Sequence, residues 1–321
     1  MSAPTLLTVQ LARKVPEADG ICGLELRPLP GQHLPAFSAG SHIELHLPGG
    51  LCRTYSMCND PAEADRYELG VLLEPASRGG SRAVHDHLAP GDTLQISAPR
   101  NLFALADGPG HSLLMAGGIG ITPLLSMAHQ LHHDGRPFTL HHAGRSRSRL
   151  PYVQRLQASA FAARVQHHLD DDPASALDIA ATLAAAPAGS HLYVCGPQGY
   201  MDAVLAAARA RGWPEANLHW EFFSAAPTAR ADDGSFEIEL ARSGRVLAVP
   251  ASHSVIQVLT EAGVIVPTSC EQGVCGTCLT RVLAGQPDHR DLYLTPEEQA
   301  ANDQFTPCCS RALSARLVLD L

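Results

Sequence analysis

Four cysteines toward the C-terminal end of the chain have the spacing of an iron–sulfur ligand set. Cys270, Cys275 and Cys278 share the loop Cys-Glu-Gln-Gly-Val-Cys-Gly-Thr-Cys, and Cys308 follows after a further 29 residues. This is the C-x₄-C-x₂-C…C spacing of plant-type [2Fe–2S] sites. The two glycines of the loop allow tight turns that point backbone N–H groups at the sulfurs. We therefore expect these four thiolates to hold one [2Fe–2S] cluster.

Two alternatives remain open for these cysteines. A Cys₄ set also suits tetrahedral Zn²⁺, although structural zinc sites more often pair two C-x₂₋₄-C units. Cys309 directly follows Cys308 and is another candidate for the fourth ligand. We favour Cys308 because its interval from Cys278 matches the plant-type pattern. The nine cysteines are an odd number without the regular intervals of a disulfide framework, which indicates thiolate ligands in a reducing compartment.

A second group of residues has the chemistry to hold a flavin. In Arg53-Thr54-Tyr55-Ser56 the arginine can pair with a phosphate, the aromatic ring can stack on a flavin, and the last hydroxyl can bond its polar edge. Alone, this pattern also fits an ordinary strand with an exposed arginine. A second pattern is Arg78-Gly79-Gly80-Ser81-Arg82, which places glycines and a hydroxyl at the start of a predicted helix. Such a group forms either an anion site or a plain N-cap.

Two glycine-bearing turns indicate a dinucleotide site. The first turn follows an apolar strand and opens a helix, and its glycines allow close backbone approach to a nucleotide. It contains Gly117, Gly118, Gly120, Thr122 and Pro123. This is not the G-x-G-x-x-G fingerprint. The second turn follows a later strand of the same sheet, so the two can face one crevice. It consists of Cys195, Gly196 and Pro197, and Cys195 is alternatively a buried structural thiol.

The hydrophobic patterning predicts three kinds of structure to position these groups. A small antiparallel β-barrel is predicted by short strands and one helix, at 81–88. These strands are 6–11, 23–29, 42–47, 53–57, 67–73 and 93–97. A parallel sheet is predicted next, because strands and helices alternate. The strands are 112–116, 138–143, 164–169, 191–195 and 217–222, and the helices begin after 123 or lie at 152–159, 177–186 and 198–210. A small, polar linker then leads to a hairpin at 236–240 and 246–249 and a helix at 254–262.

Composition narrows the class of protein. The net charge of −9 and only 23 scattered Lys and Arg residues argue against nucleic-acid binding. The longest apolar stretch, at 113–128, is short and broken by glycine and proline, which argues against a membrane span. The first residues lack a signal peptide, so we expect a cytoplasmic protein. Paired histidines have no zinc-protease spacing, and we assign no second metal.

The order of these motifs resembles the ferredoxin-reductase superfamily, and specifically the phthalate dioxygenase reductase family. The resemblance covers almost the whole chain. Besides the motifs above, it includes Ser97-Ala-Pro-Arg-Asn-Leu-Phe103, His219-Trp-Glu-Phe-Phe223, Pro287-Asp-His-Arg-Asp291 and Cys308-Cys-Ser-Arg-Ala312. It implies a multidomain chain with an FMN-binding antiparallel β-barrel at 1–106 and an NADH-binding α/β domain at 107–226. A linker at 227–235 and an α+β, β-grasp [2Fe–2S] ferredoxin domain at 236–321 would follow.

The resemblance also implies roles for individual residues. Arg53, Thr54, Tyr55 and Ser56 would hold the flavin, and Gly79, Gly80, Ser81 and Arg82 would surround its phosphate. The nicotinamide coenzyme would lie on Gly117, Gly118, Gly120, Thr122, Pro123, Cys195, Gly196 and Pro197, with Phe223 near the flavin ring. Ser56, Thr122, Cys195 and Phe223 would line the reacting centre. No adenine platform stands out, which favours FMN over FAD.

The expected activity follows from this order of cofactors. A nicotinamide gives a hydride, a flavin can release single electrons, and a [2Fe–2S] cluster carries one electron at a time. NADH is the expected donor, while Arg145 and Ser146 leave NADPH as the alternative. The expected partner is a terminal oxygenase of the Rieske non-haem iron type. The rival functions are the same role for a haem (P450-type) monooxygenase and a zinc-stabilised binding protein without enzymatic activity.

Overall fold

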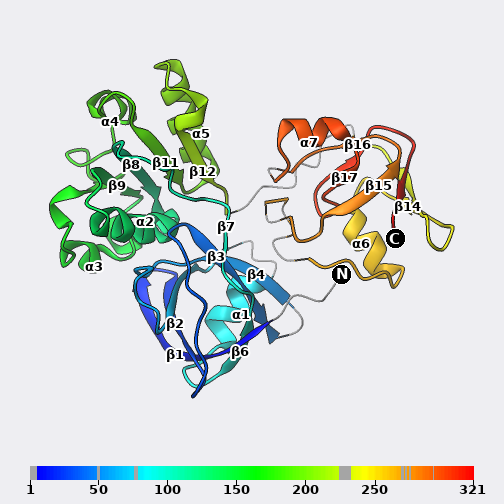
Figure 1. The fold of residues 1–321 in the computed structure, drawn as a ribbon, viewed down its shortest axis with the longest axis horizontal. Helices are drawn as coiled ribbons and strands as arrows, with labels where there is room; N and C mark the ends of the chain where they lie inside the picture. Colours follow the sequence, from blue (N-terminus) through cyan, green and yellow to red (C-terminus); the bar gives the residue numbers. More distant parts are fainter. Residues whose placement is uncertain are drawn as a thin grey trace. The chain divides into compact units, whose positions relative to one another are not determined.

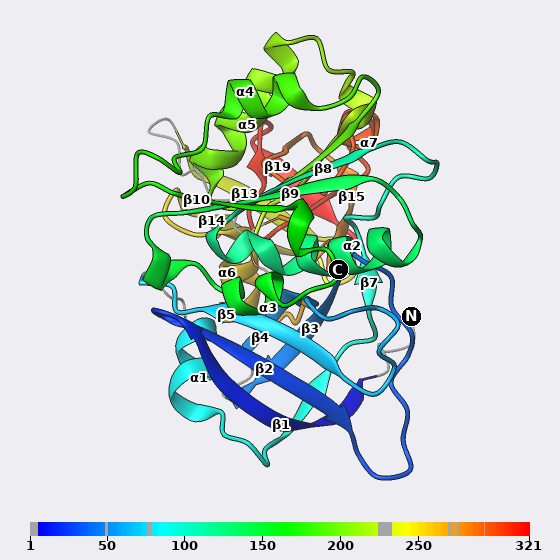
Figure 2. The ribbon, with the colours of Figure 1, turned by 90° about the vertical axis from the view of Figure 1, so that its left-hand side faces the viewer.

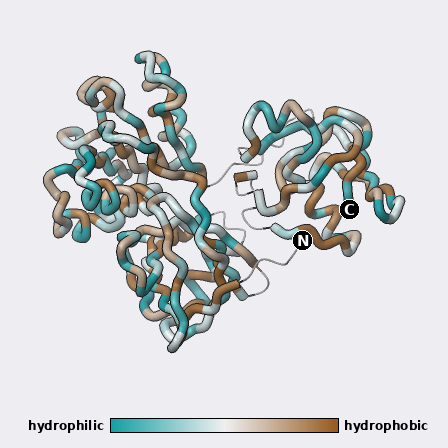
Figure 3. Tube along the Cα trace, in the orientation of Figure 1, coloured by the Kyte–Doolittle hydropathy of each residue, from teal (hydrophilic) through white to brown (hydrophobic). Residues whose placement is uncertain are grey.

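The computed structural model describes residues 6–48, 51–75, 79–223, 233–268, 271, 273–274, 276–291 and 293–321. The chain forms two compact units, Met1–Phe223 and Ser224–Leu321, which are drawn in Figure 1. The first unit contains both the antiparallel and the parallel sheet, and the second contains a mixed sheet. Figure 3 shows apolar stretches along the trace of both units, as expected for units that each bury a hydrophobic core.

The first sheet is antiparallel throughout. Its strands are β1 (Leu7–Ala18), β2 (Ile21–Pro28), β3 (Ser41–Leu47), β4 (Leu51–Ser56), β5 (Tyr67–Leu72), β6 (Thr93–Ile96) and β7 (Arg100–Asn101). Their order is β4-β3-β6-β1-β2-β5, with β7 paired to β3, and a bridge from Met57 to Leu69 joins the two end strands. Inward side chains such as Val9, Ile43 and Ile96 are fully buried. The predicted antiparallel barrel is confirmed, with α1 (Gly80–His87) as its helix.

Strand β1 is longer than its pattern predicts. The apolar alternation ends near Leu11, whereas β1 continues to Ala18. Pairing with β2 maintains the strand through Arg13, Lys14 and Pro16, with register shifts on either side of this stretch. Backbone hydrogen bonding to a neighbouring strand therefore outweighs the local side-chain pattern.

The second sheet is parallel, with the order β10-β9-β8-β11-β12. Its strands are β8 (Ser112–Gly117), β9 (Phe138–Gly144), β10 (Val165–Leu169), β11 (His191–Cys195) and β12 (Leu218–Glu221). The helices are α2 (Ile121–His133), α3 (Val153–Gln157), α4 (Ile179–Ala185) and α5 (Gln198–Ala210). All of β8 is buried, because Leu114 faces the α2 side and Leu113 faces the α4 and α5 side. Helix α2 begins two residues before Pro123, which the first turn of a helix tolerates.

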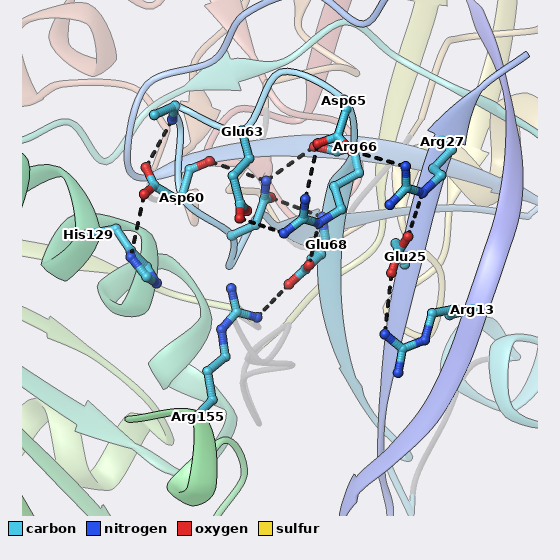
Figure 4. A network of polar contacts seen from close by, with 12 residues as sticks. Arg13, Glu25, Arg27, Asp60, Glu63, Asp65, Arg66, Glu68, His129 and Arg155 are labelled. Atoms are coloured by element: carbon cyan, nitrogen blue, oxygen red, sulfur yellow. Dashed lines mark hydrogen bonds and ion pairs between the residues drawn. The ribbon is translucent and has the colours of Figure 1, made fainter. Parts of the chain in front are cut away.

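The barrel and the parallel sheet share a packed boundary. Figure 2 shows α2 and α3 between the parallel sheet and the barrel, with α4 and α5 on the far side of the sheet. The core beneath α2 includes the barrel-side residues Ala39, Cys58 and Phe103. A polar network crosses the same boundary: Arg155 on α3 donates to Glu68 on β5 over 2.5 Å, and Asp60 lies 3.7 Å from His129 on α2 (Figure 4).

The second unit has a mixed sheet in the order β14-β13-β19-β15-β17. Its strands are β13 (Phe236–Leu240), β14 (Arg245–Val249), β15 (Thr280–Ala284), β17 (Gln304–Phe305) and β19 (Arg316–Leu319), and β16 (Pro287–Asp288) pairs with β18 (Arg311–Ala312). The predicted hairpin is confirmed as β13–β14, and β13 pairs in parallel with β19. Helix α6 (Val255–Glu261) packs on this sheet, and α7 (Pro296–Ala301) precedes β17. This is the expected α+β, β-grasp arrangement.

The predicted linker falls mostly outside the described residues. At its end, Asp233 pairs with Arg290 over 2.9 Å, and the carbonyl of Gly234 accepts from Arg311 over 2.9 Å. These two residues therefore pack on the second unit. Within the described residues, no helix is both long and apolar enough to cross a bilayer.

Candidate functional site

The two glycine turns of the parallel sheet touch each other. Strands β8 and β11 are neighbours, yet β8 leads into α2 on one face of the sheet and β11 leads into α5 on the other. A Cβ atom on Gly196 would lie 2.8 Å from Gly117 Cα, and one on Gly120 would lie 2.2 Å from the Cys195 carbonyl oxygen. Only glycine allows this approach. The turns thus meet at the switch point where open parallel sheets bind nucleotides.

His142 stabilises the first of these turns and was missed in the sequence. It is fully buried on β9, and its Nε2 lies 3.1 Å from the carbonyl oxygen of Gly118. Burial lowers the pKa of His142 to about 3. The imidazole is therefore neutral at physiological pH and donates its proton to that carbonyl. The only sequence signal was a histidine pair within an apolar strand, which has no specific spacing.

Thr122 lies where the parallel sheet meets the barrel. It is almost fully buried, and its hydroxyl donates to the carbonyl of Ile119 over 3.1 Å. Opposite it, Gly70 of β5 has no side chain, and a Cβ there would lie 2.8 Å from the Thr122 methyl and 2.6 Å from the hydroxyl of Tyr152. The bare backbone of Gly70 lets the turn at 118–122 pack directly against the barrel.

The predicted phosphate residues converge at the start of α1. The side chain of Arg53 crosses Gly80 so closely that a Cβ there would lie 2.5 Å from Arg53 Cγ. Gly79 has a φ of 92°, a left-handed conformation that favours glycine. Ser81 accepts from the backbone N–H of Glu74 over 3.1 Å, and Arg82 is exposed on the same turn. These residues fit an anionic phosphate group; Arg78 lies outside the described residues.

Ser56 connects the barrel to the last strand of the parallel sheet. Its hydroxyl donates to Glu221 over 2.9 Å. Burial raises the pKa of Glu221 to about 7, although the bond from Ser56 works in the opposite direction. Cys195 is the register partner of Glu221, and burial and that carboxylate raise its thiol pKa. A hydroxyl, a neutral thiol and a carboxyl that titrates near neutrality therefore lie together. Tyr55 and Thr54 precede Ser56 on β4, and Tyr55 packs against the barrel core.

Glu221 is a site residue that the sequence reasoning did not assign. It stands in the motif His219-Trp-Glu-Phe-Phe223, of which only Phe223 received a role. Phe223 is 38% exposed and ends the first unit. The signal for Glu221 lies in its pairing with Ser56, 165 positions earlier in the chain, which no local pattern reveals.

Arg145 and Ser146 follow β9 at the carboxyl end of the sheet. Arg145 is exposed, and Ser146 is partly buried with its hydroxyl 3.4 Å from that of Ser148. An exposed guanidinium at this edge is compatible with either nicotinamide coenzyme.

The thiol site of the second unit brings together Cys278, Cys308 and Cys309, all of them buried. Hydrogen bonds that Cys308 donates to Cys278 and Cys309, together with burial, raise the pKa of Cys308. Cys309 also contacts Thr306, with its sulfur 3.3 Å from that hydroxyl. Cys278 and Cys308 are two of the four soft donors that a [2Fe–2S] cluster requires, and bound iron would deprotonate its ligands. Cys270 and Cys275 lie outside the described residues.

The glycines of the cysteine loop occupy crowded positions. A Cβ on Gly273 would lie 2.4 Å from Cys309 Sγ, and one on Gly276 would lie 2.2 Å from the Tyr293 ring. Both have φ values near 70°, which favour glycine. Only glycine therefore fits at these two positions.

Comparison with known proteins places the chain in a family. Residues 238–313 match the 2Fe-2S iron-sulfur cluster binding domain, and residues 97–218 match the N-terminal domain of the dimethylamine monooxygenase subunit DmmA-like family. The chain is 39% identical to phthalate dioxygenase reductase of Burkholderia cepacia, over 98% of this chain and 97% of that protein. The solved structure titled phthalate dioxygenase reductase, a modular structure for electron transfer from pyridine nucleotides to [2Fe-2S], matches with a TM-score of 0.78 and covers 98% of each chain.

The chain belongs to the phthalate dioxygenase reductase family. Another member, the vanillate O-demethylase oxidoreductase of Pseudomonas sp. strain HR199, is 54% identical over 95% of this chain and 96% of its own length. An intact self-sufficient cytochrome P450 monooxygenase matches with a TM-score of 0.82 and 36% identity, and this chain spans 41% of that longer protein. Membership of the family makes the chain an oxidoreductase with a [2Fe–2S] domain and excludes the zinc-stabilised binding protein.

Proposed function

We propose that the chain is the reductase component of an oxygenase system, taking a hydride from NADH onto FMN and passing single electrons through its [2Fe–2S] cluster. The observation that carries the proposal is the meeting of Ser56, Cys195 and Glu221 at the switch point of the parallel sheet. The flavin, coenzyme and cluster parts would correspond to residues 1–106, 107–226 and 236–321, with the linker at 227–235. We place the protein in the cytoplasm, where thiolate ligands remain reduced.

Each part of the site has a role in this proposal. FMN and the cluster, when bound, supply the conversion of an electron pair into single electrons. Arg53 and the backbone at Gly79 and Gly80 would hold the flavin phosphate. The turns at Gly117 and Gly196 would admit the coenzyme, with Thr122 and Phe223 at the reacting centre.

The carboxyl of Glu221 would serve as a proton reservoir next to the flavin. Because its pKa is about 7, it exists in both protonation states at neutral pH. The Ser56 hydroxyl would orient the Glu221 carboxyl and hold a proton beside it, since hydroxyl groups both donate and accept. The neutral thiol of Cys195 would exclude water from the same corner.

We propose a Rieske-type non-haem iron oxygenase or demethylase acting on an aromatic acid as the electron acceptor. The 54% identity to a vanillate O-demethylase oxidoreductase supports an O-demethylase partner. A haem partner is the second candidate, supported by the P450 match and by 42% identity to the beta subunit of a heme-dependent oxidative N-demethylase of Ectopseudomonas mendocina.

Two measurements on the purified protein test the electron-transfer role and the identity of the partner. The protein, purified without oxygen, should contain about one FMN and two irons, and its flavin and cluster absorption should bleach with NADH. Zinc in place of iron, or no bleaching, would contradict the electron-transfer role. Electron delivery to a purified vanillate O-demethylase oxygenase, compared with a bacterial P450, then separates the two partners.

A further inference from the structure

Three metal-binding side chains gather on the face of the barrel sheet that points away from its core. On β3, Ile43 and Leu45 are fully buried in the barrel. Glu44 and His46 alternate with them and therefore point to the other face. Cys52 on β4 is the register partner of His46 and shares this face.

The three donor atoms are close enough to share one ion. Cys52 Sγ lies 3.9 Å from His46 Nε2 and 4.0 Å from Glu44 Oε2, and all three donors lie within 4.8 Å of one another. Zinc bonds of about 2.3 Å to sulfur and about 2.0 Å to nitrogen or oxygen place tetrahedral ligands roughly 3.5 Å apart. The donors therefore need to close by only a fraction of an ångström on average, which side-chain rotation can supply.

The surroundings hold the carboxylate in place. Arg100 Nη1 lies 3.6 Å from Glu44 Oε1, whereas the other oxygen, Oε2, faces Cys52. The backbone N–H of Glu44 donates to Ser97 over 2.9 Å. The paired strands β3 and β4 thus fix the donors in advance, which reduces the entropic cost of binding.

The ligand types select the ion. A thiolate, an imidazole and a carboxylate together suit Zn²⁺ and leave a fourth position for water. Mg²⁺ and Ca²⁺ prefer oxygen ligands alone. Other histidine pairs, such as His141 with His168, offer only two such donors in the part of the chain that the structure describes.

We propose that Glu44, His46 and Cys52 form a Zn²⁺ site on the barrel, separate from the flavin, coenzyme and cluster residues. Binding forms a zinc–sulfur bond and breaks the S–H bond of Cys52, and its proton passes to the solvent. Metal uptake therefore releases about one proton per ion, because a thiol loses its proton when it ligates a metal.

The test compares zinc uptake by the full-length holoprotein and two site variants, Cys52→Ser and His46→Gln. Each protein is incubated with ZnCl₂ and freed of loose metal by gel filtration, and zinc and iron are then measured on the same sample. The wild type is expected to retain about one Zn²⁺ more per chain than either variant, with unchanged iron, and to release about one proton in weakly buffered solution.

Cys22→Ser is the matched control. Cys22 is also a barrel thiol beside a histidine, with its sulfur 3.5 Å from His85 Nε2, but it does not belong to the three-donor group. This variant is expected to keep the wild-type zinc content. Equal zinc in the wild type and in both site variants overturns the proposal, as does a loss of the same size in the control. Because the iron content reports the cluster separately, failure of the zinc site is distinguishable from failure of the electron-transfer function.

Discussion

The guanidinium of Arg155 on α3 donates a 2.5 Å hydrogen bond to the carboxylate of Glu68 on β5. This contact joins the parallel-sheet part of the first unit to the barrel (Figure 4). Glu68 also accepts from Arg66 over 2.7 Å, so its charge is shared between two cations. The pKa of Glu68 is lowered because Arg155 and Arg66 outweigh the effect of burial.

Removing this contact should weaken the first unit. Arg155→Met and Glu68→Gln should show a coupling of about 1.5 kcal/mol in a double-mutant cycle, since hydrogen bonds between charged, partly buried groups exceed surface ion pairs. Urea unfolding of the four proteins measures it. The pair Arg13 and Glu25, 3.7 Å apart with Arg13 68% exposed, is the control and should show coupling near zero. Equal coupling in the two pairs would contradict the prediction.

Gly70→Ala should disturb the coenzyme turn. The added methyl would lie 2.6 Å from the Tyr152 hydroxyl and 2.8 Å from the Thr122 methyl, so the turn at 118–122 must move. Overpacking of this kind costs about 1–3 kcal/mol of stability. We also expect a higher KM for NADH in steady-state assays. Gly110→Ala is the control, because its Cβ would make ordinary contacts of 3.6 Å; a similar loss there would argue against the steric explanation.

Glu221 should make stability depend on pH. Its folded pKa is about 7, above the ordinary value of 4.5, so the folded protein binds more protons than the unfolded chain between these values. The contribution of protonated Glu221 to the free energy of unfolding is therefore fully present below pH 4.5 and is lost as the pH rises through 7. Urea unfolding at pH 5 to 8 should show the wild type losing stability relative to Glu221→Gln. A pH-independent difference between the two proteins would disprove this assignment.

Ser56→Ala should shift that pH window. The hydroxyl stabilises the ionised form of Glu221, so its removal raises the carboxyl pKa further and moves the loss of stability to higher pH. The same series of unfolding curves measures the shift. A window that moves to lower pH would mean that Ser56 favours the protonated form.

The two adjacent cysteines should differ in their effect on iron. Cys308→Ser should lose the cluster, because the Cys308 thiol hydrogen-bonds to Cys278, another expected ligand, whereas Cys309→Ser should retain it, because the Cys309 sulfur also has the hydroxyls of Thr306 and Ser310 as partners. Iron analysis and the visible spectrum of each purified variant decide between them. Iron loss confined to Cys309→Ser would instead assign Cys309 as the ligand.

The elements with strong periodicity could be predicted from the sequence, and those formed by tertiary pairing could not. The strand at His191–Cys195 and the helix at Gln198–Ala210 have the predicted bounds, because each carries a clear apolar pattern. The short strands after the cysteine loop were not predicted, since two-residue strands such as Gln304–Phe305 exist only through their partners. Helix α7 had a usable signal, because Thr295 and Glu298 form a capping box.

The residues of the candidate site also differ in whether a local pattern or a distant contact defines them. Arg53, Gly80 and Ser81 belong to contiguous motifs, and the structure brings them together. His142 and Glu221 act through contacts with distant segments, so their types and spacing gave no signal. Sequence motifs thus indicated candidate ligand-binding residues, and missed residues that hold those candidates in place.

The end of the first unit at Phe223 has a consequence for kinetics. Ten residue steps separate Phe223 from Asp233, which already packs on the cluster-bearing unit. Ten steps span at most about 35 Å even when fully extended. Because both units belong to one polypeptide chain, electron transfer between them is a first-order step. The rate of electron transfer within one chain should therefore not change when the protein is diluted.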